Sequence, residues 1–129
     1  MVYDMYQENI LDHYQNPRNL GKLEPADLAA RENNPLCGDT IELFLKLGPD
    51  QRVADVKFQG QGCAISQSAI SMLTEELKGK HVKELEPLAT KDHIFQLLGV
   101  PISHARIKCA LLSMDVLLLA IKDWQSKHR

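Results

Sequence analysis

Two short stretches of alternating apolar and polar residues, with a turn between them, limit the folds open to this chain. Apolar side chains occupy every second position of residues 41–47, and residues 54–58 repeat the pattern. The sequence Gly48-Pro49-Asp50 between them is typical of a turn. Alternation with a period of two marks strands with one buried face, so these residues predict an antiparallel hairpin. A further short strand is expected around residues 28–31.

The rest of the chain shows helical spacing of its apolar residues. Near the N-terminus this spacing ends at Asn16-Pro17, which should stop the first helix. Strands followed by helices predict an α+β fold, with a small antiparallel three-stranded sheet and helices packed mainly on one face. The predicted helices cover residues 3–14, 64–78, 92–98 and 107–124.

Size and charge restrict the class of protein. A length of 129 residues is typical of one domain, so we expect residues 1–129 to form a single unit. Fifteen Lys and Arg against seventeen Asp and Glu leave a net charge of −2, which disfavours nucleic acid as a partner. The first fourteen residues resemble no signal peptide, and the longest apolar stretch, residues 116–121, is far shorter than the ~20 residues of a membrane span. We therefore expect a cytoplasmic protein without a membrane contact.

The chain has three cysteines, and each lies at a break in the strand and helix pattern. Cys37 occupies a turn before the hairpin, Cys63 separates a strand from a helix, and Cys109 lies near the start of the last helix. An odd number of distant cysteines does not make a disulfide framework and fits a reducing compartment. Because strand ends and helix starts commonly meet at one end of such a fold, the three thiols could converge there.

A convergent cluster would have a defined chemistry. The positive end of a helix dipole stabilises a thiolate, and Cys63 has that placement if a helix begins at Ala64. Asp39, two residues after Cys37, is the nearest candidate for a fourth ligand. Three thiolates and one carboxylate suit zinc or an iron–sulfur unit. The oxygen ligand would be the weak position of such a site, which favours release over storage.

Spacing alone leaves two other interpretations open. Free cysteines are often inert core residues, and the chain has no C-x-x-C pair. A thiol hydrolase is also conceivable, although no local signature of that chemistry is present. The base of such an enzyme would come from one of five histidines: His13, His81, His93, His104 and His128.

Five separated motifs add a resemblance to a known family. They resemble, in chain order, the motifs of the IscU/SufU/NifU-type iron–sulfur cluster assembly scaffolds, and the similarity runs from about Tyr3 to the end of the chain. The motifs are ILDHYQNPRN at residues 10–19, NPLCGD at 34–39, GCAIS at 62–66, LTE with KGK at 73–80, and IKC at 107–109.

The resemblance implies a site and a reaction. Cys37, Cys63 and Cys109 would be the thiolate ligands, with Asp39 as the accompanying acid. Such a scaffold accepts persulfide sulfur from a pyridoxal-phosphate cysteine desulfurase, with Cys109 and Cys37 as candidate acceptors. It combines this sulfur with iron into a transient [2Fe-2S] cluster and passes the cluster to apo-proteins. Zinc is the metal expected in the isolated protein.

Lys108 separates two branches of the family. IscU-like members have a histidine at this position, and a protonated lysine has no lone pair with which to bind a metal. Lys108 could instead stabilise the Cys109 thiolate or pair with Asp39. This residue type is similar to the SufU-like branch, so a zinc-dependent sulfurtransferase that stimulates its desulfurase is the alternative function. The 46 positions from Cys63 to Cys109 resemble the IscU-like layout instead.

The segment before the third cysteine bears on a further partner. IscU-like scaffolds have Leu-Pro-Pro-Val-Lys there, which an Hsp70-type chaperone binds in extended form. Residues 102–106 of this chain, ISHAR, lack both prolines and their extended preference, so we do not expect the chaperone. His104 in this segment is either an unusual ligand or a proton donor beside the metal ligands, or an exposed histidine at a helix start.

Overall fold

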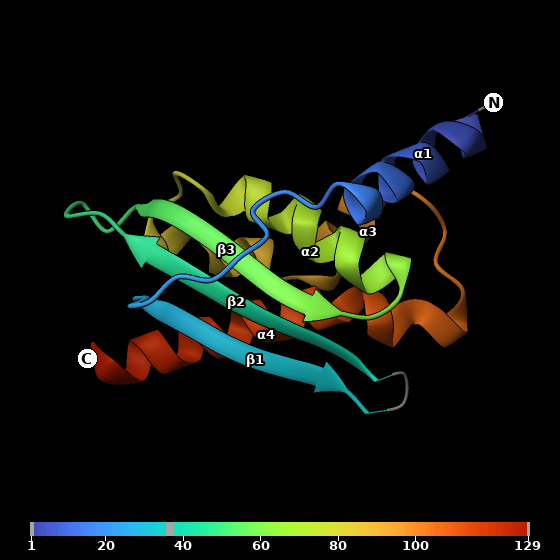
Figure 1. The fold of residues 1–129 in the computed structure, drawn as a ribbon. Helices are drawn as coiled ribbons and strands as arrows, with labels where there is room; N and C mark the ends of the chain where they lie inside the picture. The colour runs from blue at the N-terminus through green and yellow to red at the C-terminus, as the bar shows by residue number, and fades with distance from the viewer. Residues whose placement is uncertain (1, 36–37, 129) are drawn as a thin grey trace.

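A three-stranded antiparallel sheet forms one layer of the molecule (Figure 1). The computed structural model describes residues 2–35 and 38–128, with side chains from residue 8 onward. The strands are β1 (Leu28–Asn34), β2 (Asp39–Leu47) and β3 (Val53–Gln61), and β2 lies between the other two. This arrangement confirms the predicted hairpin and the third strand.

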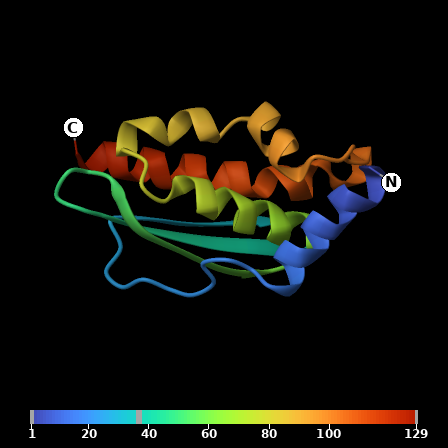
Figure 2. The ribbon, with the colours of Figure 1, turned by 90° about the horizontal axis from the view of Figure 1, so that it is seen from above.

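Four helices are present in the described residues: α1 (Val2–Gln15), α2 (Ala64–Leu77), α3 (Lys91–Leu98) and α4 (Ile107–Lys127). Helices α2 and α4 cover one face of the sheet, and α3 packs on both of them (Figure 2). Helix α1 packs on α2 and extends beyond the body of the molecule (Figure 1). The single-turn helices are η1 (Val82–Glu84), η2 (Glu86–Leu88) and η3 (His104–Arg106). The predicted α+β class, with helices mainly on one face, is confirmed.

The hydrophobic core lies between the sheet and helices α2 and α4. Leu43 in the central strand pairs with Phe58 of β3, and both side chains are buried. Leu73 from α2 and Leu117 from α4 are also fully buried in this cluster. The alternation seen in the sequence therefore places its apolar positions toward the helices.

The other face of the sheet is crossed by the segment that follows α1 (Figures 1 and 2). Its backbone pairs with the outer edge of β3, where the Phe58 amide donates to the Asn19 carbonyl at 2.9 Å and the Gly21 amide donates to the Phe58 carbonyl at 2.8 Å. At its end the Asp27 amide donates to the Leu45 carbonyl at 2.9 Å. This pairing covers the edge of β3.

A buried hydrogen-bond network holds α1 on α2. The His13 ring is 6% exposed, and its Nδ1 lies 2.8 Å from Ser71 Oγ. The Arg18 amide donates to the same hydroxyl oxygen at 2.9 Å, which leaves the hydroxyl proton for His13 Nδ1. Burial lowers the pKa of His13 below its ordinary value, and the Arg18 charge acts in the same direction. These contacts fit a neutral ring with its proton on Nε2, 3.5 Å from Glu75 Oε1.

Strands β1 and β3 are longer than predicted, because pairing with β2 decides where they end. Strand β1 continues to Asn34 because its polar last residues pair with β2, Asn34 lying opposite Asp39. Strand β3 continues through Gly60, where a Cβ would collide with the Thr40 carbonyl oxygen. Only glycine permits the two strands to remain paired at that position.

The helix ends follow local capping. Thr90 accepts the His93 amide at 3.2 Å, so α3 begins at Lys91, and Gly99 ends it in the left-handed conformation. None of the helices in the described part of the chain is long and apolar enough to cross a lipid bilayer.

Candidate metal centre

Three predicted site residues come together at one end of the sheet. Asp39 begins β2, Cys63 precedes α2, and Cys109 is in the first turn of α4. Their ligand atoms, one from each side chain, all lie within 4.8 Å of one another. Asp39 is 3% and Cys109 1% exposed, whereas Cys63 is partly exposed. The structure therefore brings two of the three predicted thiols, Cys63 and Cys109, together with Asp39.

The backbone before α2 brings Cys63 to Asp39. The Cys63 thiol donates to Asp39 Oδ2 at 3.5 Å. Gly62 adopts a φ of +155°, and a Cβ there would lie 2.7 Å from Asp39 Cγ and 2.8 Å from Ser66 Oγ. Glycine is therefore required at position 62 both by the conformation and by the closeness of the carboxylate.

Cys63 is the residue immediately before the first turn of α2. Its backbone is extended, and its carbonyl accepts the Gln67 amide at 3.1 Å and the Ser66 hydroxyl at 3.1 Å. Cys63 is therefore the N-cap residue of α2, beside the backbone amides of its first turn.

Cys109 is a buried thiol with a polar neighbour. The Asn34 side-chain Nδ2 donates to Cys109 Sγ at 3.8 Å, and Asn34 is itself 6% exposed. Asn34 ends β1 opposite Asp39. The end of the β1–β2 pair therefore carries both the carboxylate and the amide that contacts the Cys109 thiol. Sequence reasoning did not identify Asn34.

The fourth predicted ligand, Cys37, lies outside the described residues. In the sequence it falls between Asn34 and Asp39, which are paired residues of β1 and β2. Its role as a ligand and as a sulfur acceptor stays a prediction.

Arg106 is a second residue that sequence reasoning missed. It lines a depression of about 500 Å³ together with Asp39, Cys63 and Cys109. Arg106 precedes Cys109 by three positions, and residues three apart near a helix start share a face. This spacing could have identified it.

Lys108 and His104 are close to Arg106 in the sequence, but neither lines the depression that contains Cys63 and Cys109. Lys108 is exposed and lines another depression with Asn33, Asn34 and Asp115. His104 is exposed in η3. The described lining of the Cys63 and Cys109 depression contains neither residue, so their effect on the ligands stays a prediction.

The donor set fits a soft metal ion. Two thiolates bound at about 2.3 Å to one zinc ion lie at most about 4.6 Å apart, close to the spacing of these atoms. Two sulfur ligands favour zinc or iron over magnesium or calcium, and the carboxylate adds a harder, weaker ligand. The three side chains can therefore hold such an ion after small movements.

Comparison with known proteins shows which family the chain resembles. Residues 5–129 match the NifU-like N-terminal domain family. The chain is 40% identical over 124 residues to the iron–sulfur cluster assembly scaffold protein IscU 1 of Archaeoglobus fulgidus, covering 96% of this chain and 79% of that protein. It is also 40% identical over 129 residues to the zinc-dependent sulfurtransferase SufU of Bacillus subtilis, covering 88% of this chain and 86% of that protein.

A solved structure supports the relation at the level of the fold. The putative iron–sulfur cluster assembly scaffold protein for the SUF system from Fervidobacterium islandicum is similar with a TM-score of 0.78 and 29% identity, covering 92% of this chain and 98% of that one. Sequence, fold and the meeting of Asp39 with two thiols agree. The chain therefore belongs to the NifU-like N-terminal domain family, the family of the IscU and SufU proteins.

Proposed function

We propose that this chain, acting as one domain, is an iron–sulfur cluster assembly scaffold in the cytoplasm. The observation that carries the proposal is the meeting of the Asp39 carboxylate with the Cys63 and Cys109 thiols within 4.8 Å. The IscU relatives at 40% identity support it. Cys37 supplies the third thiolate in this proposal.

The first reaction is acceptance of sulfur from a cysteine desulfurase. A thiolate of the scaffold, on Cys109 or Cys37, attacks the outer sulfur of the donor persulfide. The new S–S bond forms on the scaffold, the donor S–S bond breaks, and the donor leaves as a thiolate. The step needs no oxidant because one S–S bond replaces another.

The second reaction is assembly of a [2Fe-2S] cluster from ferrous iron and this sulfur. Reduction of two persulfide sulfurs to two sulfides takes four electrons, of which two come from two ferrous ions that become ferric and two come from a dithiol reductant. Cys37, Cys63 and Cys109 then bind iron through sulfur and Asp39 binds it through oxygen. Because an oxygen ligand binds a soft cluster weakly, Asp39 marks the position from which an apo-protein takes the cluster.

A second candidate function is a zinc-dependent sulfurtransferase. The SufU relative is also 40% identical, and Lys108 replaces the histidine of IscU-like members. In that function zinc, bound by the same thiolates and Asp39, holds the thiols deprotonated for sulfur acceptance.

The chaperone partner is not part of the proposal. Its omission rests on the sequence, because residues 102–106 lack both prolines of the IscU-like segment.

Anaerobic reconstitution tests the choice between the two functions. The chain is incubated with ferrous iron, cysteine, a dithiol reductant and a cysteine desulfurase, and visible charge-transfer bands are recorded. A scaffold gives these bands, and Cys37→Ser, Cys63→Ser or Cys109→Ser abolishes them. Ser113→Cys, a new buried thiol further along α4, is a control that should not restore them in the Cys109→Ser chain. A colourless chain that contains zinc and accepts sulfur would refute the scaffold and establish the sulfurtransferase.

A further inference from the structure

The two outer edges of the sheet differ in whether another segment covers them. On β3, the Val53 amide donates to the Lys80 carbonyl at 2.8 Å, and residues 19–21 pair with Phe58 further along the strand. Strand β1 forms the other edge, because β2 lies between β1 and β3 (Figure 1). Within the described part of the chain, residues 28–33 form backbone hydrogen bonds with no segment other than β2. Strand β1 is therefore the open edge of the sheet.

The register of the sheet shows which backbone groups of β1 point out from this edge. Phe58 bonds to residues 19–21 through both its amide and its carbonyl, so it does not bond to Leu43, its partner in β2. The backbone groups of Leu43 therefore point toward β1, where Ala30 is its partner. Because bonded and non-bonded pairs alternate along an antiparallel ladder, every second residue of β1 has its amide and carbonyl directed outward. These residues are Ala29, Arg31 and Asn33.

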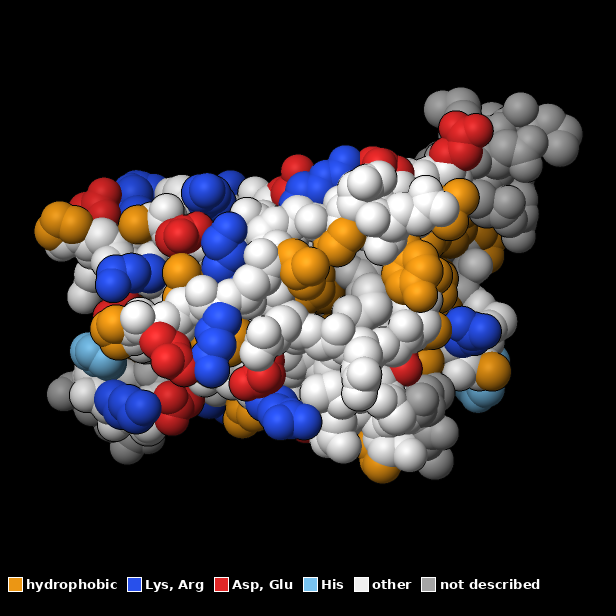
Figure 3. Space-filling model, in the orientation of Figure 1, with side chains coloured by type: hydrophobic (Ala, Val, Ile, Leu, Met, Phe, Trp, Pro, Cys, Tyr) orange, Lys and Arg blue, Asp and Glu red, His pale blue; other side chains and the backbone are white. Residues whose placement is uncertain are grey.

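The charge of the side chains along this edge differs between the two faces of the sheet. Arg31 is exposed on the face away from the helices. Glu32 is half-buried on the helix face, because it pairs with the buried residue Ile41. Burial raises the pKa of Asp115 in α4 above its ordinary value, and the charge of Glu32 acts in the same direction, so the two carboxylates are neighbours. Charged side chains of both signs gather over this part of the sheet (Figure 3).

An apolar hollow continues the helix face of this edge toward the metal centre. Leu111 and Met114 of α4 line it beside Asn34, the last residue of β1, and its volume is about 310 Å³. The Asn34 side chain also contacts the Cys109 thiol. A segment that pairs with the open edge therefore has one end beside the metal centre.

These features suit an added β-strand. Outward amides and carbonyls bind an extended backbone, and the side chains on each face select its sequence. A second copy of this chain fits poorly, since a two-fold pair centred on Arg31, the middle residue of β1, places two arginines opposite each other. A protein that receives the cluster fits better, because it must bring its own ligands to the metal centre.

We propose that a protein that receives the cluster adds an extended segment to β1 as a further, antiparallel strand. Its residue opposite Arg31 is acidic, and its residue opposite Glu32 is basic. An apolar residue opposite Asn34 enters the hollow. The order along the segment is therefore apolar, any residue, basic, acidic. The proposal rests on the proposed function, since it requires a cluster to transfer, and it adds where and by what chemistry the recipient binds.

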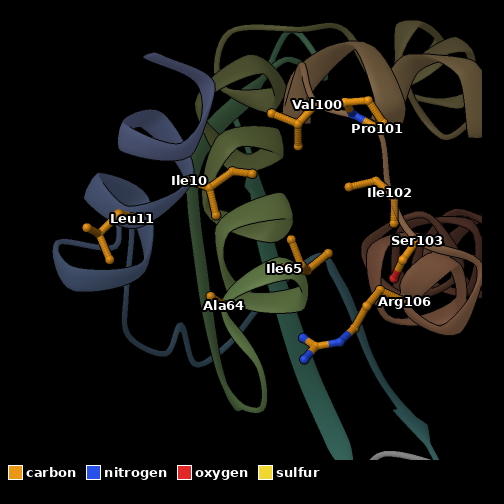
Figure 4. Close-up of a pocket in the computed structure, with 9 residues that line it drawn as sticks. All are labelled: Ile10, Leu11, Ala64, Ile65, Val100, Pro101, Ile102, Ser103 and Arg106. Carbon is orange, nitrogen blue, oxygen red and sulfur yellow. The ribbon is translucent and has the colours of Figure 1, made fainter. Parts of the chain in front are cut away.

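Another apolar hollow, of about 540 Å³, offers a competing place for a peptide. It lies between α1, the start of α2 and residues 100–103, and the side chains of Ile65 and Ile102 point toward each other across it (Figure 4). None of its described lining residues belongs to β1. Ile102→Glu therefore places a charge in this hollow and leaves the edge of β1 unchanged.

Two peptides of equal composition test the edge without a cluster. The first, Thr-Leu-Thr-Lys-Glu-Val-Thr-Thr, has the proposed order, and the second exchanges its Lys and Glu. Ala29→Pro removes one outward amide and leaves the bonds to β2 in place, whereas Ala29→Val retains the amide. Dissociation constants are measured by fluorescence anisotropy with labelled peptides, and coinciding thermal melts show that the variants are folded.

The first peptide should bind the unmodified chain, and Ala29→Pro should raise its dissociation constant about tenfold or more, because a peptide carbonyl loses its donor. Ala29→Val and Ile102→Glu should leave it within about twofold, as surface changes outside a contact do. Arg31→Glu combined with Glu32→Arg should make the exchanged peptide the tighter ligand, by about threefold or more, because cross-strand ion pairs are restored. No binding of the first peptide, equal binding to Ala29→Pro and Ala29→Val, or a loss in Ile102→Glu alone refutes the added strand.

Cluster transfer to apo-ferredoxin separates this proposal from the proposed function. Ala29→Pro and Ala29→Val should assemble the cluster with equal charge-transfer bands, because Ala29 is not a ligand. The apo-ferredoxin concentration at half-maximal rate should rise about tenfold in Ala29→Pro alone, with the maximal rate unchanged. If the cluster forms and both variants transfer it equally, the added strand is wrong and the function stands. If the unmodified chain forms no cluster, the function is wrong and the docking of a recipient falls with it.

Discussion

Substitution of Gly62 by alanine is the most direct test of the metal centre's architecture. The glycine has a φ of +155°, and a Cβ there would lie 2.7 Å from both Cγ and Oδ1 of Asp39. Asp39 is 3% exposed and begins a paired strand, so it has little room to move aside. We therefore expect Gly62→Ala to displace the carboxylate from Cys63 and to destabilise the fold.

Gly62→Ala should lower the free energy of unfolding in two separate ways. A residue with a side chain in this backbone region costs about 1–3 kcal/mol of unfolding free energy. Overpacking against buried atoms costs about a further 1–3 kcal/mol. Gly79, which follows α2, has a φ of +86° and no atom within 4 Å of a built Cβ. Gly79→Ala is therefore a matched control that incurs strain without the collision.

The assay combines urea unfolding with a zinc titration of the reduced protein. Gly62→Ala should lose more unfolding free energy than Gly79→Ala, and it alone should bind zinc more weakly, by about tenfold for each 1.4 kcal/mol of lost ligation. Equal zinc affinity in the unmodified chain and in Gly62→Ala would refute the argument that Gly62 holds Asp39 in the ligand set.

Two other predictions concern His13 and Asp39. Because burial lowers the pKa of His13, the unfolded chain binds more protons than the folded chain below the ordinary value of 6.5. Unfolding free energy should therefore fall as the pH drops below about 6.5, and urea titrations should show a smaller fall for His13→Gln than for the exposed control His128→Gln; equal slopes contradict this. Asp39→Cys replaces the weak oxygen ligand by a thiolate, so it should slow cluster transfer to an apo-ferredoxin, measured by circular dichroism; an unchanged rate would show that Asp39 does not set release.

The fold was predictable from the sequence wherever apolar residues recurred with a single spacing, every second residue for a strand or every three to four for a helix. The alternation in residues 41–47 and the stripe in residues 107–124 each specify an element and its buried face. The ends of the strands and helices were not predictable from this spacing of apolar residues. Asn34 is a polar residue with low strand preference, and it becomes a strand residue because it pairs with Asp39.

The meeting of Asp39, Cys63 and Cys109 was predictable from the sequence, but the residues around them were not. Cys63 and Cys109 were identifiable because they stand at breaks in the pattern, and Asp39 because it follows a cysteine. Asn34 carries no chemical signature, and its contact with Cys109 spans 75 positions of sequence, so only the folded chain reveals it. The different placements of Arg106 and Lys108 depend on where helix α4 begins, which the sequence alone leaves uncertain.

The placement of the ligands at element starts bears on how a cluster can leave. Ends of strands and helices open at a lower free energy than a packed core. Asp39 begins β2 and Cys109 lies in the first turn of α4, while the core between the sheet and the helices continues along both elements. We therefore expect a cluster held by these residues to be released by movement at the ends, while the core stays packed.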